Sequence, residues 1–189
     1  MTGRIDRLAK EYPVAIRWTA FPLHPETPEE GRSLEDLFAG RGVDLDEVLD
    51  RLRRVAEAEG LPLGRRKMTY NSRLAQELGK WAEKKGKGEE FHRATFHAYF
   101  ADGLNIATTT VLLQLADEAG LPTAEALEVL ETRAFKDSVD QDWARSRSLG
   151  ITAVPTLLLN RRVLVGAQPY ETMKRFLESE GVSPREHSA

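Results

Sequence analysis

Residues 150–169, GITAVPTLLLNRRVLVGAQP, decide the fold. Thr156 to Leu159 is a short β-branched and aliphatic run of the kind that forms a buried strand. The chain turns at residues 160–162, and residues 163–165 return as a second strand. Gly166 ends that strand, and Pro169 suits the first turn of a helix over residues 169–180, because the first turn leaves N–H groups unbonded anyway. The stretch therefore predicts a Val-Pro pair, a β-hairpin and a helix in succession.

The 189-residue chain has the composition of an ordinary globular protein. Apolar residues make up 41%, charged residues 30%, and the formal net charge is −3. This charge offers no electrostatic basis for binding nucleic acid. No apolar run approaches the roughly 18 residues of a membrane span, and residues 1–7 lack the apolar core of a signal peptide. We therefore expect a cytoplasmic protein with neither nucleic-acid nor membrane partners.

The sequence contains no cysteine. This excludes disulfides, thiolate metal sites and a cysteine nucleophile within the chain. The histidines do not form a metal motif either. His92 and His97 are five apart and point about 140° away from each other on a helix, His24 lies between prolines, and His187 lies in the C-terminal tail. We expect no metal site.

The N-terminal segment predicts a helix followed by a strand. Apolar residues at helical spacing indicate a helix over residues 3–12, which Pro13 ends. Val14, Ile16 and Trp18 then alternate with more polar residues, a period-two pattern that predicts a strand over residues 14–18.

Between residues 33 and 149 the sequence predicts helices and no convincing strand. They cover 33–39, 44–59, a segment capped by Asn71 or Ser72 that ends before Gly86, 89–101, 108–119, 123–132 and 135–149. Short amphipathic helices cannot bury their apolar stripes alone, so we expect them to pack on one another. The chain is thus predicted to hold a helical insertion subdomain, 33–149, between two halves of one α/β domain, 1–32 and 150–189. The cationic run at residues 65–67 is interpreted as a solvated turn.

Five segments resemble, in wording and in order, the FrnE-like branch of the DsbA family of thiol–disulfide oxidoreductases. They are Arg17–Pro25, Tyr70–Ser72, Phe96–Ile106, Val154–Thr156 and Gly166–Pro169. The resemblance spans nearly the whole chain. It implies an α/β, thioredoxin-like fold with a large all-helical insertion, in which the Val154–Pro155 bond is cis and the hairpin follows beside the active site.

The chain departs from that family at its beginning. Family members open with a strand and a Cys-Pro-Trp-Cys type motif, and the segment after that motif resembles residues 2–8. We therefore expect that the first strand and the CxxC motif are absent. A misplaced start codon, a shortened chain or a genuine loss would each explain this, and the first is favoured. The segments 14–18 and 156–159 would then close onto each other, borrow a strand from a second chain as a homodimer, or leave the fold poorly stable.

The resemblance also implies where a substrate would bind. In the family a thiolate attacks a disulfide, and the backbone around the cis-proline aligns the substrate strand. Val154, Pro155 and Thr156 are therefore the expected platform for a protein or peptide thiol or disulfide. Asn71 is expected chiefly as a helix cap, with a second role lining the cleft. Because the redox cysteines are absent, we expect no dithiol–disulfide exchange by this chain, for example in insulin reduction, and whether it is an enzyme stays open.

Two other functions stay open from the sequence. The first is a non-enzymatic peptide-binding or dimerisation module that uses the same groove. The second is a glutathione-dependent enzyme similar to 2-hydroxychromene-2-carboxylate isomerase, whose relatives use a serine in place of the first cysteine. Ser33 and Ser72 do not match that position and are interpreted as helix caps.

Overall fold

The computed structural model describes residues 2–40 and 42–185, and it divides the chain into two compact units. The first unit comprises residues 1–23 and 142–189, and the second comprises residues 24–141. The division therefore falls earlier at both places than the expected boundaries after residues 32 and 149. One cause lies in helix α8 (Lys136–Ser148). Its Asp142 carboxylate accepts a hydrogen bond from the Ala20 N–H (3.0 Å) and pairs with Arg17 (3.5 Å), so the end of α8 packs with the N-terminal segment.

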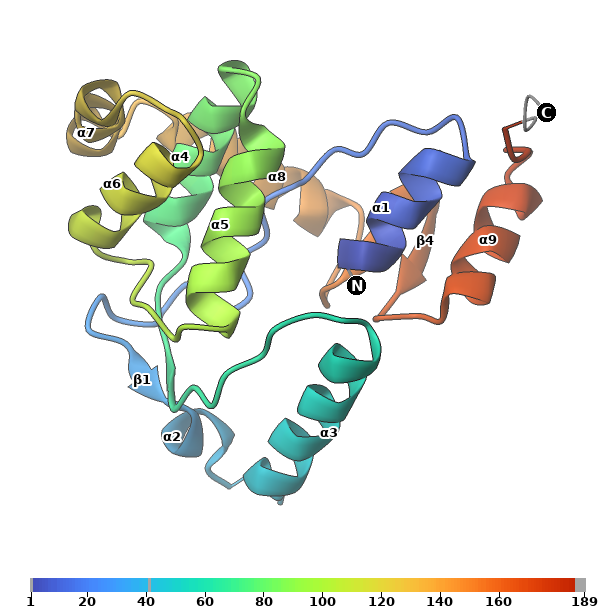
Figure 1. The fold of residues 1–189 in the computed structure, drawn as a ribbon, viewed down its shortest axis with the longest axis horizontal. Helices are drawn as coiled ribbons and strands as arrows, with labels where there is room; N and C mark the ends of the chain where they lie inside the picture. The colour runs from blue at the N-terminus through green and yellow to red at the C-terminus, as the bar shows by residue number, and fades with distance from the viewer. Residues whose placement is uncertain (1, 41, 186–189) are drawn as a thin grey trace. The chain divides into compact units, whose positions relative to one another are not determined.

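The first unit contains two further helices and a hairpin (Figure 1). They are α1 (Thr2–Glu11), β3 (Thr156–Leu159), β4 (Arg162–Val165) and α9 (Tyr170–Ser179). β3 and β4 are antiparallel, with Thr156 opposite Val165 and Leu159 opposite Arg162. Asn160 begins the turn with φ +54°, a conformation that asparagine tolerates better than most residues. The hairpin and the helix after it are confirmed.

The core of the first unit lies between α1, α9 and one face of the hairpin. Its buried members are Ile5, Leu8, Tyr12, Met173, Phe176 and Leu177, and the hairpin contributes Leu157, Leu159 and Leu164. Because side chains alternate along a strand, the opposite face carries the other four residues. Two of those four, Val163 (44%) and Val165 (49%), are exposed.

The predicted strand over residues 14–18 is wrong. Val14 and Trp18 pack against the same core, but the segment forms no ladder, and Ile16 is 41% exposed. A strand exists only through hydrogen bonds to a neighbour, and alternation alone cannot supply that neighbour. Within the described residues β3 pairs only with β4, so closure of segment 14–18 onto residues 156–159, one of the three expected alternatives, is also absent.

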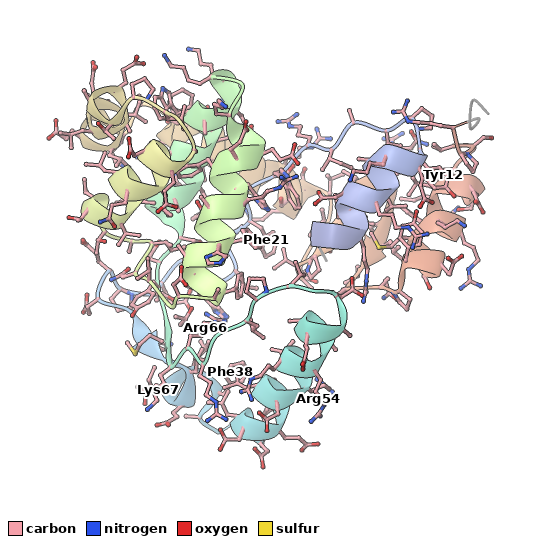
Figure 2. All side chains as sticks on the ribbon, viewed as in Figure 1. Tyr12, Phe21, Phe38, Arg54, Arg66 and Lys67 are labelled. Carbon is pink, nitrogen blue, oxygen red and sulfur yellow. The ribbon has the colours of Figure 1, made fainter. Side chains whose placement is uncertain are left out.

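Tyr12, at the end of α1 (Figure 2), gives a test of this core. It is fully buried and its hydroxyl donates to Glu178 Oε1 (2.8 Å). Burial, helped by that carboxylate, raises the pKa of Tyr12 to about 12 from 10.0. The unfolded chain therefore loses this proton first, and the stabilisation disappears as pH rises through that interval. Tyr12→Phe should cost about 1 kcal/mol at neutral pH and flatten the alkaline fall, as urea unfolding at pH 9 and 11 would show. An unchanged slope would contradict the assignment.

The second unit is mainly helical. Its elements are β1 (Arg32–Ser33), α2 (Leu34–Phe38), α3 (Leu45–Ala58), β2 (Met68–Thr69), α4 (Arg73–Lys84), α5 (Gly88–Phe100), α6 (Thr109–Glu118), α7 (Thr123–Thr132) and the start of α8. The predicted helices are confirmed to within one or two residues. The prediction that this region holds no strand is wrong, because Arg32 pairs with Thr69 and Ser33 with Met68. Two-residue strands are too short to show a period in the sequence.

Helices α4, α5, α6 and α7 enclose the core of the second unit (Figure 1). Among its largest buried side chains are Leu78, Trp81, Phe91 and Leu112. Helix α3 differs, because its apolar stripe contains no buried residue. Leu52 is 49% exposed and Val55 is 50% exposed. The expectation that every amphipathic helix buries its stripe is therefore wrong for α3.

A buried carboxylate joins three helices of this unit. The Glu77 side chain is 2% exposed and receives two hydrogen bonds of 2.7 Å from Arg133 and one of 2.5 Å from Arg73. Arg73 also pairs with Asp140 (2.7 Å) on α8. Burial alone would raise the pKa of Glu77, but the two guanidinium groups outweigh it, and the pKa lies below the usual 4.5. Glu77 is thus ionised and links α4 to α8 and to the end of α7.

Candidate functional site

Val154, Pro155 and Thr156 form one continuous segment at the start of the hairpin. The Val154–Pro155 peptide bond is cis. The Pro155 carbonyl accepts a hydrogen bond from the Gly166 N–H (2.8 Å), and the Thr156 hydroxyl donates to the Ala153 carbonyl (2.7 Å). Both sides of Val154 are therefore held in place by the hairpin and its preceding loop.

Val154 itself is left open. The residue is 44% exposed, and its backbone N–H and carbonyl have no hydrogen-bond partner among the described residues. A residue with a free donor and a free acceptor can pair with an extended chain as a neighbouring strand would. Pro155 lacks an N–H and so adds no competing donor beside it. The structure thus presents one residue with an unpaired N–H and an unpaired carbonyl on an anchored loop.

The loop opposite this segment is held by a contact that sequence patterns do not reveal. Gly166 has φ +89°, which favours glycine, and the Gln168 amide donates to the Val165 carbonyl (2.7 Å). Arg4 Nη1 on α1 donates to the carbonyl of Gln168 (2.6 Å) and more weakly to that of Ala167 (3.3 Å). More than 160 residues of sequence separate these partners. The sequence feature closest to this contact is the position of Arg4 on the predicted N-terminal helix, next to its apolar residues.

Asn71 lies in the second unit, and its side chain is fully used. Its Oδ1 accepts from the Arg73 N–H (2.9 Å), as expected at a helix start. Its Nδ2 donates to the carbonyls of Thr27 (2.7 Å) and Pro25 (3.2 Å). Asn71 therefore starts α4 and fixes the segment before β1. Its second expected role, lining a substrate cleft, stays a prediction.

The cationic run at residues 65–67 is only partly a solvated turn. Arg65 and Lys67 are exposed, but Arg66 is half-buried beside the end of α5 (Figure 2). The Arg66 guanidinium lies 4.4 Å from the centre of the Tyr99 ring and 5.1 Å from that of Phe100, and it donates to the Tyr99 hydroxyl. This is a cation–π contact that packs the loop on α5. The interpretation of Arg66 as solvated is therefore wrong.

The remaining polar clusters do not suggest a reaction. His97 Nδ1 lies 3.0 Å from Asp102 Oδ2 in a cavity of about 310 Å³, whose lining contains no serine, threonine or cysteine. Across residues 2–40 and 42–185 no group of three His, Cys, Asp or Glu side chains is placed to hold a metal ion, and His187 lies outside that part. Over the same residues, no helix has the length and apolar character needed to cross a membrane.

The family model described as "DSBA-like thioredoxin domain" matches residues 1–178. This chain belongs to that family. The fold is accordingly the DsbA-like thioredoxin fold, a mixed α/β fold with many helices and few short strands. The predicted family and fold class are confirmed, whereas membership of the FrnE-like branch stays a prediction.

Solved structures similar to this chain agree with the assignment of the fold. The chain is 27% identical to SCO1869 from Streptomyces coelicolor, described as a probable DsbA oxidoreductase, with a TM-score of 0.86 over 95% of this chain and 83% of that one. A 2-hydroxychromene-2-carboxylate isomerase is 20% identical, with a TM-score of 0.74 over 95% and 86% of the two chains. The cytosolic disulfide reductase DsbM from Pseudomonas aeruginosa is 23% identical, with a TM-score of 0.53 over 71% and 75%. The last two show likeness of fold alone. A comparison with curated proteins finds no match.

Proposed function

We propose that this DsbA-family chain binds an extended thiol- or disulfide-bearing polypeptide at Val154–Pro155–Thr156 and does not itself exchange dithiols and disulfides. The observation that carries the first half is the unpaired backbone of Val154 on a loop anchored through Pro155 and Thr156. The second half rests on the composition, because the chain contains no cysteine. Without a thiolate there is no nucleophile to attack a disulfide sulfur.

The chemistry of such a ligand follows from the platform. A polypeptide that runs antiparallel to Val154 can donate one N–H to its carbonyl and accept from its N–H. The exposed Val154 side chain would contact an apolar neighbour of the substrate cysteine. Each hydrogen bond contributes about 0.5–1.5 kcal/mol, so the platform alone supports modest affinity and little sequence selectivity.

Substitutions at Val154 test this proposal. Val154→Pro removes the N–H donor and should weaken binding of a fluorescent, disulfide-bridged peptide by about tenfold, which corresponds to about 1.4 kcal/mol. Val154→Ala keeps both backbone groups and should change the affinity by less than about threefold. Fluorescence anisotropy measures both, with circular dichroism as the check on folding. Equal binding by Val154→Pro and the unchanged chain would refute the proposed site.

The proposal also includes a cellular location and a second candidate ligand. A cytoplasmic location accords with the similar protein DsbM, which is described as cytosolic. Glutathione is a second candidate ligand, because it is a short thiol peptide with backbone amides and because DsbM has also been solved with GSH. Oxidised glutathione in the same anisotropy experiment, as a competitor, tests whether so short a peptide occupies the platform.

A further inference from the structure

The bonding pattern of the hairpin leaves one edge of β3 with unpaired backbone groups. The Gly166 N–H donates to the Pro155 carbonyl, and register places these two residues opposite each other. Hydrogen-bonded and non-hydrogen-bonded pairs alternate along an antiparallel ladder. Leu157 and Leu159 therefore bond to β4, whereas Thr156 and Leu158 direct their N–H and carbonyl groups to the other edge. Within the part of the chain that the structure describes, those groups have no backbone partner.

This edge of β3 differs from the outer edge of β4. All four residues of β3 are half-buried, while β4 is exposed at three of its four residues. Water can satisfy the outward groups of β4, but half-buried groups on β3 are less well hydrated and cost more when unpaired. Arg162 also begins β4, and a charged side chain discourages pairing at an edge. The edge of β3 that faces away from β4 is therefore the one that needs a strand.

We propose that a second copy of this chain supplies the strand, by pairing its β3 edge with this one around a two-fold axis at Leu157. In this register Thr156 of each copy lies opposite Leu158 of the other, so all the outward N–H and carbonyl groups of both residues are paired. The same register brings Asn160 of the second copy opposite Val154, so a second copy and a peptide compete for one edge, and the peptide of the proposed function binds by displacing the second copy. The edge is thus complementary to itself in donors and acceptors. The two hairpins join into one four-stranded sheet.

The neighbouring positions fit the same register. Leu157 lies opposite Leu157 of the second copy, and these aliphatic side chains share the face that packs on the core of each first unit. Pro155 falls at a non-hydrogen-bonded position opposite Leu159, where its missing N–H costs nothing. Arg161 lies opposite Ala153, so no two cations face each other across the axis. Nothing on this edge opposes the pairing electrostatically.

The absence of native cysteine makes a direct crosslinking test available. In a non-hydrogen-bonded antiparallel pair the Cα atoms are about 4.5 Å apart, which is within reach of a disulfide. Leu157→Cys should therefore form a covalent dimer under mild oxidation, seen by non-reducing electrophoresis. Leu164→Cys is the matched control, because it lies on the same face and in the same core but one strand away. It should stay monomeric under the same conditions.

Sedimentation velocity provides the second measurement. The unchanged chain should sediment as a dimer, and Leu158→Pro should be monomeric, because proline removes only the N–H that faces away from β4. Val163→Pro makes the equivalent change on the outer edge of β4 and should leave the dimer intact. Equal crosslinking of the two cysteine variants would overturn the proposal. So would a wild-type chain that is monomeric in the absence of added peptide.

Discussion

Replacing Glu77 with glutamine is expected to lower the free energy of unfolding by about 3–5 kcal/mol, the cost typical of breaking one side of a buried ion pair. The amide keeps the shape of the carboxylate but not its charge. Arg73 and Arg133 would then remain close together with one anion fewer between them. The backbone of Arg133 also depends on Glu77. Arg133 takes a left-handed conformation (φ +53°) at the end of α7, where glycine is the usual residue, and its two hydrogen bonds to Glu77 help to hold it there.

Glu83→Gln is the control for this substitution. Glu83 lies on the same helix and pairs with Lys80 at 3.1 Å, but its side chain is 39% exposed. Exposed pairs contribute about 0–1 kcal/mol, so this variant should differ little from the unchanged chain. Urea denaturation followed by circular dichroism measures both. Similar losses for the two variants would show that burial does not set the value of the Glu77 pair.

The ion pair also predicts an acid dependence. The pKa of Glu77 is lower in the folded chain than its ordinary value of 4.5, because two guanidinium groups outweigh the cost of burial. Its contribution is therefore present above the unfolded pKa and is lost as pH falls through the folded one. Between pH 5 and pH 3 the unchanged chain should lose more stability than Glu77→Gln. Parallel curves would argue that another group governs the acid response.

Leu78→Ala is the second substitution with a large expected effect. Leu78 is fully buried in the core of the helical unit, so its removal should cost about 2–5 kcal/mol through lost burial and a cavity. The same change at Leu52 on α3 should cost less than about 0.5 kcal/mol, because half of that side chain is already in water.

This pair of leucines separates sequence pattern from actual burial. Both lie on the apolar stripe of a strongly amphipathic helix, and hydrophobic spacing alone does not distinguish them. Urea unfolding of the two variants gives the comparison. If Leu52→Ala were as destabilising as Leu78→Ala, α3 would have a packing partner in solution that the described residues do not contain.

The hairpin and the helices could be predicted from the sequence because their signals are local. Glycines and prolines mark the ends of residues 150–169, and the stretch holds two aliphatic runs three residues apart. The start of helix α3 is also marked locally: the Asp44 carboxylate accepts a hydrogen bond from the Glu47 N–H (3.0 Å), as expected of a helix cap. Such features depend on neighbours within a few residues, so the sequence predicts their positions correctly.

The predictions that are wrong concern residues whose structural partners are distant in sequence. Residues 14–18 have the alternation of a strand, but no described segment pairs with them. The two-residue strands β1 and β2 pair across more than 30 residues and carry no period. Arg66 belongs to a cationic run, and only the position of Tyr99 and Phe100 on a later helix makes it a packed residue.

The candidate site shows the same division. The family resemblance predicts Val154, Pro155 and Thr156 as the substrate platform; the family is confirmed, and the platform stays a prediction. The anchoring of the surrounding loop by Arg4 depends on a helix at the other end of the chain, which the sequence did not reveal. The two hydrogen bonds from Asn71 to the segment before β1 were equally hidden, because they require the folded position of residues 25–27.

The central claim is that this DsbA-family chain binds a disulfide-bearing peptide at Val154–Thr156 without consuming the disulfide. The most direct test is a ¹H–¹⁵N NMR titration of the 189-residue chain with a disulfide-bridged peptide, in which signals of both molecules are followed. We predict that the amides of Val154 and Thr156 shift on binding while the peptide disulfide stays intact. Loss of the disulfide, or shifts confined to residues 24–141, would contradict this account.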